Sequence, residues 1–317
     1  MIDSNRNEER FLQPAPELQP EPQPIDTTDD TPTLAPIPEL VPEERLTDPN
    51  AVQIPVTQVN VVGSTIFDET DFAPLTSQVE GQNVTIQDLQ VLADGITQLY
   101  LDAGYITSRA LLVEQEVVDG VVQIQVIEGR ISNIEVEGNA RVRTSYIHDR
   151  VALGADVPVR TDRLEDQLRL LRVNPLFENV EASLRAGEGA GESILVVRVE
   201  EANALTYNVS VDNYSPPVVG SERLGATLGY RNVSGLGDAI SVSYDRTTTG
   251  QSYVWDLGYR IPLNPMEGTL QFRVLFDNNT IPVTELLDVD GESELYEFSF
   301  RQPLVRTPRE EFALSLG

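Results

Sequence analysis

Residues 224–231 read Leu-Gly-Ala-Thr-Leu-Gly-Tyr-Arg, and residues 240–245 read Ile-Ser-Val-Ser-Tyr-Asp. In both stretches large apolar side chains alternate with small or polar ones, which is the period of a β-strand with two different faces. The alternation returns in three later segments, 253–259, 270–276 and 296–300. These segments predict an antiparallel sheet that occupies the chain from residue 204 onward.

Two kinds of protein contain such strands. In a soluble sandwich the apolar face forms the core, whereas in a membrane β-barrel it meets lipid and the polar face lines a wet lumen. The segments fit the roughly 9 to 11 residues of a tilted strand that crosses a bilayer, and Tyr and Trp stand near their ends. A short turn at 235–238 alternates with a polar connection predicted from Asp277 to Ser293, as in barrels. The pattern favours a membrane barrel and leaves the sandwich as the alternative.

The chain before residue 204 contains an internal repeat. An alternating strand closed by glycine occurs at 59–63 and again at 134–138. Each copy continues with a helical pattern, for which Thr85 with Asp88 predicts the first cap and Asp162 with Glu165 the second. Two strands joined by a turn finish each copy, at 108–117 and 121–127 and then at 180–186 and 193–200. The repeated unit is strand, helix, helix, strand, strand, which is a small α+β module.

Composition excludes several functions. The net charge is −29, from 51 acidic and 22 basic residues, and this balance argues against a nucleic-acid partner, which needs a basic surface. The sequence has no Lys and no Cys, so a phosphate-loop lysine, a thiol nucleophile and a thiolate metal site are all missing. His148 is the only histidine, and no obvious nucleophile lies beside it in the sequence. We therefore expect no catalytic residues, no metal site, no cofactor and no enzymatic activity.

Residues 1–55 are acidic and rich in proline, a composition that cannot build a core. We predict that they form a disordered linker. The opening residues lack the apolar core of a signal peptide, so a signal, if the protein is exported, is expected to have been removed.

Three groups of residues resemble a known family. The first repeat contains Val61-x-Gly63-x-Thr65, Leu99-Tyr100-x-x-x-Gly104-Tyr105-x-x-Ser108-Arg109 and a strand that ends in Glu128-Gly129. The second repeat contains Ile134-x-Val136-x-Gly138-Asn139 and Asn174-Pro175. The sheet region contains Val211-Asp212-Asn213-Tyr214, Asn232-x-x-Gly235-x-Gly237-Asp238 and two aromatic-Arg-x-Pro-Leu endings at 259–263 and 300–304. From about residue 56 the chain resembles the two-partner secretion transporters (TpsB-like, hemolysin-activator type), whose periplasmic part is a pair of polypeptide-transport-associated (POTRA) domains.

The resemblance implies a domain order and a function. It divides the chain into a linker (1–55), a first POTRA domain of the secretion type (56–130), a second POTRA domain (131–203) and the first strands of an outer-membrane β-barrel (204–317). It implies that an unfolded exoprotein of the hemolysin or adhesin type binds the periplasmic modules, within residues 1–203, and crosses the barrel without ATP. An outer-membrane protein assembly factor of the same superfamily is the alternative, and a non-transporting, membrane-anchored scaffold or adhesion protein is a second one. The family's barrel has many more strands than are begun here.

The same topology predicts where the exoprotein binds. The middle strand of a POTRA module lies at a sheet edge, where its free backbone groups can pair with an extended peptide. This predicts binding by Arg109, Ala110, Leu111, Leu112, Val113 and Glu114 in the first module and by Val180, Ala182 and Leu184 in the second. The alternation after residue 204 is expected to turn four arginines toward the lumen, namely Arg231, Arg246, Arg260 and Arg273.

Overall fold

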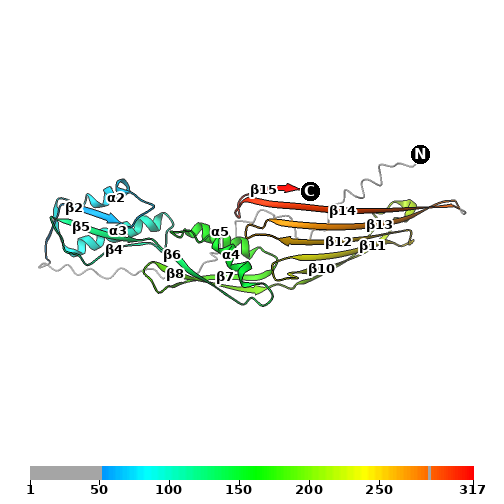
Figure 1. Ribbon diagram of the computed structural model, residues 1–317, viewed down its shortest axis with the longest axis horizontal. Coiled ribbons are helices and arrows are strands. Elements are labelled where there is room, and N and C mark those ends of the chain that lie inside the picture. Colours follow the sequence, from blue (N-terminus) through cyan, green and yellow to red (C-terminus); the bar gives the residue numbers. More distant parts are fainter. Residues whose placement is uncertain (1–51, 285–286) are drawn as a thin grey trace.

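The computed structural model describes residues 52–284 and 287–317. Two small α+β modules and a long antiparallel sheet follow one another along the long axis of the molecule (Figure 1). Within this described part, no helix is long and apolar enough to cross a membrane. Nearly all of the predicted linker lies outside the described residues.

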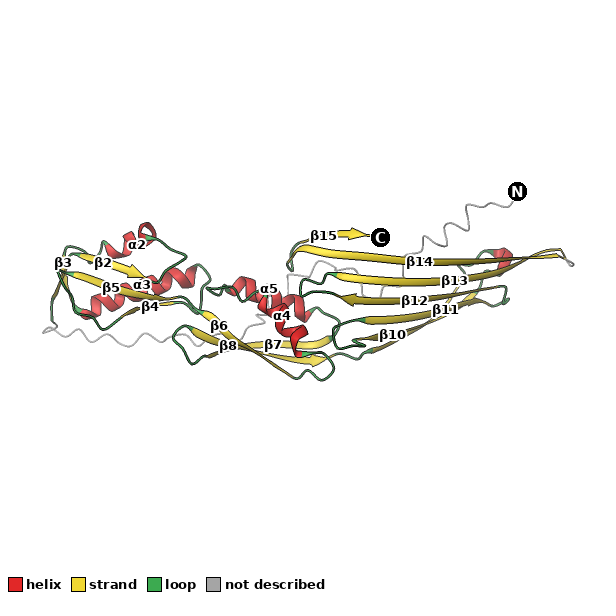
Figure 2. Ribbon diagram, viewed as in Figure 1, coloured by secondary structure: helices red, strands yellow, loops and turns green. Residues whose placement is uncertain are grey.

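The two modules have the same topology (Figure 2). In each module the first strand pairs in parallel with the last strand, and the last strand pairs antiparallel with the strand before it. The sheet orders are β2-β5-β4 and β6-β8-β7. The first module consists of β1 (Ile54–Val56), β2 (Gln58–Val62), α2 (Glu69–Thr76), β3 (Gln82–Val84), α3 (Ile86–Asp102), β4 (Arg109–Leu112) and β5 (Val121–Ile127). The second consists of β6 (Arg130–Glu137), α4 (Thr144–Ala152), α5 (Thr161–Arg172), β7 (Phe177–Ala186) and β8 (Glu192–Glu201).

The predicted order of strand, helix, helix, strand, strand is confirmed in both modules, and one of the two predicted helix caps is right. At α3, Thr85 Oγ1 accepts a hydrogen bond from the N–H of Asp88 at 3.2 Å, and the Asp88 carboxylate accepts one from the N–H of Thr85 at 2.8 Å. At α5 the prediction is wrong, because the capping position is occupied by Arg160, whose side chain makes no capping bond. Asp162 lies one residue inside that helix, and its carboxylate pairs with the Arg160 guanidinium instead.

Each module is closed by the same arrangement of a glycine and a glutamate. Gly63 and Gly138 have φ values of +88° and +87°, which only glycine adopts without strain. Each turns the chain so that the next backbone N–H groups meet a carboxylate at the end of the module: Glu128 accepts from Thr65 at 2.7 Å, and Glu201 accepts from Val142 at 2.8 Å. Burial would raise the pKa of Glu201, but bonds from three backbone N–H groups and from the Arg141 side chain hold this pKa below its usual value.

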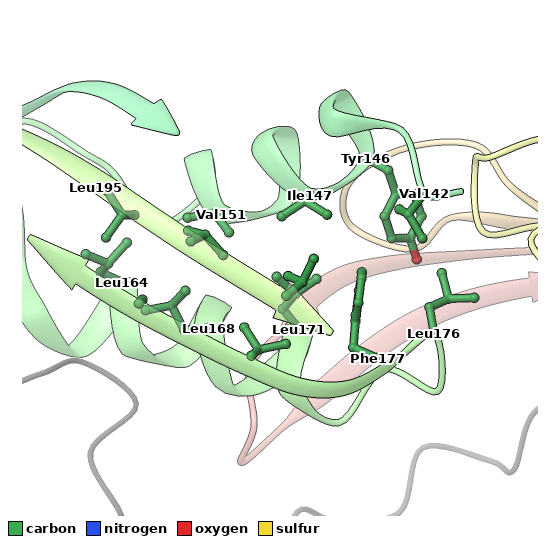
Figure 3. Packing of buried hydrophobic residues seen from close by; sticks show 14 of the residues in the cluster. Val142, Tyr146, Ile147, Val151, Leu164, Leu168, Leu171, Leu176, Phe177 and Leu195 are labelled. Atoms are coloured by element: carbon green, nitrogen blue, oxygen red, sulfur yellow. The ribbon is translucent and has the colours of Figure 1, made fainter. Parts of the chain in front are cut away.

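Each module also has its own hydrophobic core. In the first, Leu89, Ile96 and Tyr100 of α3 pack on the inner face of β5. In the second, the helices α4 and α5 pack on β7 and β8 (Figure 3). The second core ends at Tyr146, beside the sheet region.

The third part is a sheet of seven antiparallel strands in sequential order. Its strands are β9 (Leu205–Asp212), β10 (Arg223–Arg231), β11 (Ala239–Thr247), β12 (Ser252–Pro262), β13 (Thr269–Thr284), β14 (Leu287–Arg306) and β15 (Glu311–Leu316), and a short 3-10 helix, η1 (Pro217–Val219), follows β9. On the face that we call the outer face, large apolar side chains such as Leu228 and Trp255 are exposed. On the opposite, inner face, the polar side chains Ser241, Asp256 and Arg273 are buried. This polarity is the reverse of that in a soluble sandwich and is the polarity of a membrane barrel wall.

One predicted connection is part of the sheet. Within the polar stretch from Asp277 to Ser293, residues 277–284 and 287–293 do not form a loop, because they continue β13 and β14 as a paired ladder. Polar side chains bond across that ladder, as in Thr280 to Asp290 at 2.7 Å. The two strands therefore form a hairpin that extends past the neighbouring strands (Figure 1).

Candidate functional site

The two candidate binding strands, β4 and β7, lie at sheet edges. Within the described residues β4 pairs only with β5, and β7 pairs only with β8. The two edges differ in length, because β4 has 4 residues and β7 has 10. Val113 and Glu114 follow the end of β4 and are not part of the ladder.

The first edge is already engaged by its own module. The N–H of Ala110 in β4 donates to Thr97 Oγ1 on helix α3 at 2.9 Å. On the opposite edge of the same sheet, the N–H of Val59 in β2 donates to the Glu80 carboxylate at 2.8 Å. Side chains that occupy outward backbone groups in this way protect an edge from pairing with another strand.

The side chains along the two edges also divide into two groups. Ala110, Val180 and Ala182 are buried in the module cores and cannot form pockets for a peptide. Leu112 and Leu184 are partly buried against the same cores. Arg109, Leu111 and Glu114 are exposed. Any recognition at these strands must therefore use the backbone and the exposed side chains.

The four arginines predicted to face the lumen do not all lie on one face. Arg273 lies on the inner face and donates to Asp256, with its Nη2 at 2.7 Å from a carboxylate oxygen. Arg260 shares that face, because Asp256 and Arg260 are four residues apart in the same strand. Arg231 lies at the periplasmic-module end of the inner face, where its Nη1 donates to the Pro175 carbonyl of the second module at 3.4 Å.

Arg246 is on the opposite face from the prediction. It pairs in register with Leu224 and Tyr253, both of which belong to the outer face. A strand has a period of two, so Ile240, Val242 and Tyr244 place residue 246 on their own side. Two inner-face arginines were not predicted: Arg223, which pairs with Asp212 at 3.0 Å, and Arg301, which pairs with Glu311.

A third set of residues, at the junction of the second module and the sheet, was also missed. Glu267, in the turn between β12 and β13, is 8% exposed. Its Oε1 accepts from Arg150 Nη2 at 2.9 Å, from Arg150 Nε at 3.0 Å and from the Tyr146 hydroxyl at 3.1 Å. Tyr146 and Arg150 belong to α4, more than a hundred residues earlier in the chain. A cavity of about 190 Å³ adjoins this cluster, between α5 and the turn.

Among residues 52–284 and 287–317, no group of three or more His, Asp or Glu side chains is placed to hold a metal ion. The His148 ring hydrogen-bonds to the neighbouring Asp149 carboxylate at 2.9 Å.

Comparison with known proteins finds matches for the first module and for the sheet. The profile of the POTRA domain, ShlB-type, matches residues 54–129, and the profile of the haemolysin secretion/activation protein ShlB/FhaC/HecB matches residues 191–317. These two stretches of the chain therefore resemble the haemolysin secretion/activation family. The sheet accordingly lies in the bacterial outer membrane, and the POTRA modules lie in the periplasm.

Several characterised relatives are similar over part of their length. The chain is 27% identical over 200 residues to the heme/hemopexin transporter protein HuxB of Haemophilus influenzae (strain 86-028NP), covering 60% of this chain and 34% of that protein. It is 28% identical over 211 residues to the outer membrane transporter CdiB of Escherichia coli, covering 61% of this chain and 32% of that protein. The chain thus spans about a third of the length of these relatives.

A solved structure shows the same fold. CdiB from Escherichia coli superposes with a TM-score of 0.58 at 23% identity, over 87% of this chain and 52% of that one. POTRA modules followed by an antiparallel, barrel-forming sheet are therefore the fold of this protein.

Proposed function

We propose that this protein belongs to an outer-membrane transporter that binds an unfolded exoprotein through its POTRA modules and passes it through a β-barrel without ATP. Three relatives support the proposal through their names, HuxB and CdiB as transporters and the hemolysin transporter protein ShlB of Serratia marcescens, which is 24% identical over 222 residues. The observation that carries it is an open strand edge, β7, in the module that adjoins the barrel wall. Neither a catalytic residue nor a cofactor has a part in this proposal.

The open edge favours the second module as the docking site. Strand β7 offers 10 residues of backbone, enough for several ladder bonds to an extended peptide. Within residues 52–284 and 287–317, the backbone from Val180 to Leu184 forms its ladder with β8 alone. Strand β4 is shorter, and the N–H of Ala110 is held by Thr97. We infer that Val180, Ala182 and Leu184 belong to the principal binding strand and that residues 109–114 of the first module have the smaller part.

The polar inner face of the sheet suits the passage of an unfolded chain. Its charged side chains are paired with one another, as Arg273 is with Asp256 and Glu297 and Arg223 is with Asp212. Paired charges leave the wall hydrated without a strong net field that would trap a polypeptide. We propose that Arg231, Arg260 and Arg273 line this path.

We also propose boundaries for the three domains. We place the first POTRA domain at residues 56–130, the second at 131–203 and the barrel wall from 204 onward. The pairing of β1 with β3 extends the first module by a few residues into the predicted linker, because β1 begins at Ile54.

Site-specific photo-crosslinking in secreting cells tests the docking edge. Glu181 of β7 and Glu137 of β6 are both exposed, and both pair in register with Arg198 of the central strand, from opposite sides. A photoreactive side chain at residue 181 of the full-length protein should capture the exoprotein during export, and the same side chain at residue 137 should not. Capture at residue 137 alone, with export intact, would contradict docking at β7.

A further inference from the structure

Helix α4 of the second POTRA module is seated on two turns of the barrel wall. In the turn between β10 and β11, the Gly235 carbonyl accepts from the N–H of Arg143 at 2.9 Å. Gly237 lies under the Tyr146 ring, where a Cβ atom would come within 2.6 Å of the ring carbon Cε2. The two glycines therefore let the helix approach the turn closely.

The second turn, between β12 and β13, contributes the charge of Glu267. Beyond its bonds to Arg150 and Tyr146, its Oε2 lies 3.8 Å from Arg260 and 3.9 Å from Arg306. The Arg150 guanidinium also stacks on the Tyr146 ring, 3.4 Å from the ring centre. The Tyr146 hydroxyl in turn accepts from the Asn174 amide at 3.0 Å. The contact thus joins α4 and the segment just after α5 to the wall.

The backbone at Glu267 shows that its side chain is needed there. Glu267 has a φ of +63°. This backbone conformation is unfavourable in free energy for a residue with a Cβ atom, whereas glycine adopts it freely. The turn itself is held by bonds that any residue could make, since the N–H of Glu267 donates to the Asn264 carbonyl at 3.0 Å. A glycine would therefore serve the turn better. The strain is explained if the carboxylate stabilises something beyond the turn.

The carboxylate remains charged in this buried place. Burial alone would raise the pKa of Glu267, but Arg150, Arg306 and Arg260 together hold it below its usual value. The negative charge is thus present throughout the physiological pH range. Loss of the Glu267 charge would leave the buried Arg150 guanidinium without this ionic partner in the interface. A buried charge without its partner destabilises the structure.

We propose that Tyr146, Arg150 and Glu267 form an ionic latch that fixes the orientation of the second POTRA module relative to the barrel wall. Covalently, the two parts are joined by only a short segment, because β8 ends at Glu201 and β9 begins at Leu205. Without the latch the module swings about that segment. The orientation that the latch fixes does not depend on what the protein transports.

Distance measurements between spin labels test the latch in the full-length protein in lipid nanodiscs. Residues 1–317 contain no cysteine, so labels can be placed within them by Glu188→Cys in the second module and Glu310→Cys at the turn between β14 and β15, with any cysteine elsewhere in the full-length protein replaced by serine. Both positions are exposed. The unaltered protein should give one narrow distance distribution. Glu267→Gln, Glu267→Gly and Arg150→Met should each broaden it toward longer distances.

The combination of variants separates a latch from a general loss of structure. Glu267→Gly relaxes the backbone of the turn while it removes the carboxylate, so the wall should stay folded, as resistance to SDS without heating would show. The double variant Glu267→Gln with Arg150→Met should broaden the distribution no more than one single variant, since both remove the same contact. Glu165→Gln removes an ion pair with Arg169 on the surface of α5 and should leave the distribution narrow.

Hydrogen exchange gives a second measurement at the junction. The Arg143 N–H, which bonds to Gly235, should exchange roughly a hundredfold faster in Glu267→Gly than in the unaltered protein. A distribution that stays narrow in both Glu267 variants, with unchanged exchange at Arg143 and a folded wall, would overturn the latch.

Discussion

At the scale of single residues, two glycines of the first POTRA module have nearly the same backbone conformation and different surroundings. Gly63 has a φ of +88° and Gly104 a φ of +86°. A Cβ atom at Gly104 would meet nothing within 4 Å, whereas one at Gly63 would press on the Val126 carbonyl oxygen of the central strand. Substitution of these two glycines therefore separates the free-energy cost of the backbone conformation, present at both, from the cost of a steric clash, present only at Gly63.

Alanine at these two positions should destabilise the module to different degrees. Gly104→Ala is expected to lower the free energy of unfolding by about 1–2 kcal/mol, the cost of a left-handed conformation. Gly63→Ala should lower it by roughly 3 kcal/mol or more, because the backbone oxygen cannot move away. Urea unfolding of a fragment spanning residues 52–203, which contains both module cores, measures the two values. Equal losses would show that the contact with Val126 costs nothing.

At the scale of elements, the two long helices of the modules begin differently, and the difference predicts opposite effects of substitution. Thr85→Ala at α3 removes a capping bond and should cost about 1 kcal/mol. Arg160→Ser at α5 adds a capping hydroxyl where the side chain now caps nothing, and should gain about 0.5–1 kcal/mol. The exposed pair of Arg160 with Asp162 that is lost contributes little. Thermal unfolding of the same fragment checks both signs, and a stabilised Thr85→Ala or a destabilised Arg160→Ser would contradict the assignment of the caps.

Most helices and strands could be predicted from the local sequence, because the period of their apolar residues agrees with the capping and turn residues at their ends. The α3 cap, the glycine after the end of α3 and the alternating strands are all local structures that the neighbouring residues favour by themselves. The stretch from Asp277 to Ser293 could not be predicted in this way. It is polar like a loop, and the partners of its side chains lie across the hairpin, as Glu292 does for Asn278 and Asp290 does for Thr280.

At the scale of the whole molecule, the junction of module and wall was beyond prediction from sequence. Arg150 and Glu267 are far apart in the chain, and neither belongs to a pattern that links them. The nearest signal was the motif Asn232-x-x-Gly235-x-Gly237-Asp238, whose glycines lie against α4. The position of Arg246, in contrast, could have been found by continuing the count of alternate residues from Ile240.

The whole-molecule claim that the outer face meets lipid can be tested on adjacent residues of one strand. Leu228 is on the outer face in the middle of β10, where it pairs with Tyr207 and Val242 and is 58% exposed. Thr227 is on the inner face and pairs with Asn208 and Ser243. Arginine at residue 228 would carry its charge into hydrocarbon, at a cost of about 2–4 kcal/mol at the bilayer midplane, whereas arginine at residue 227 would lie in the wet interior.

The expected result is a sharp difference between two variants that carry the same new side chain. Leu228→Arg in the full-length protein should reduce the fraction that folds into membranes, measured by its resistance to SDS without heating, and Thr227→Arg should leave that fraction close to that of the unaltered protein. The comparison controls for β-propensity and for added charge, because strand, depth and side chain are matched. If Thr227→Arg were the more damaging of the two, the faces would be reversed, and the buried Ser241, Asp256 and Arg273 would have to be the polar core of a soluble sheet.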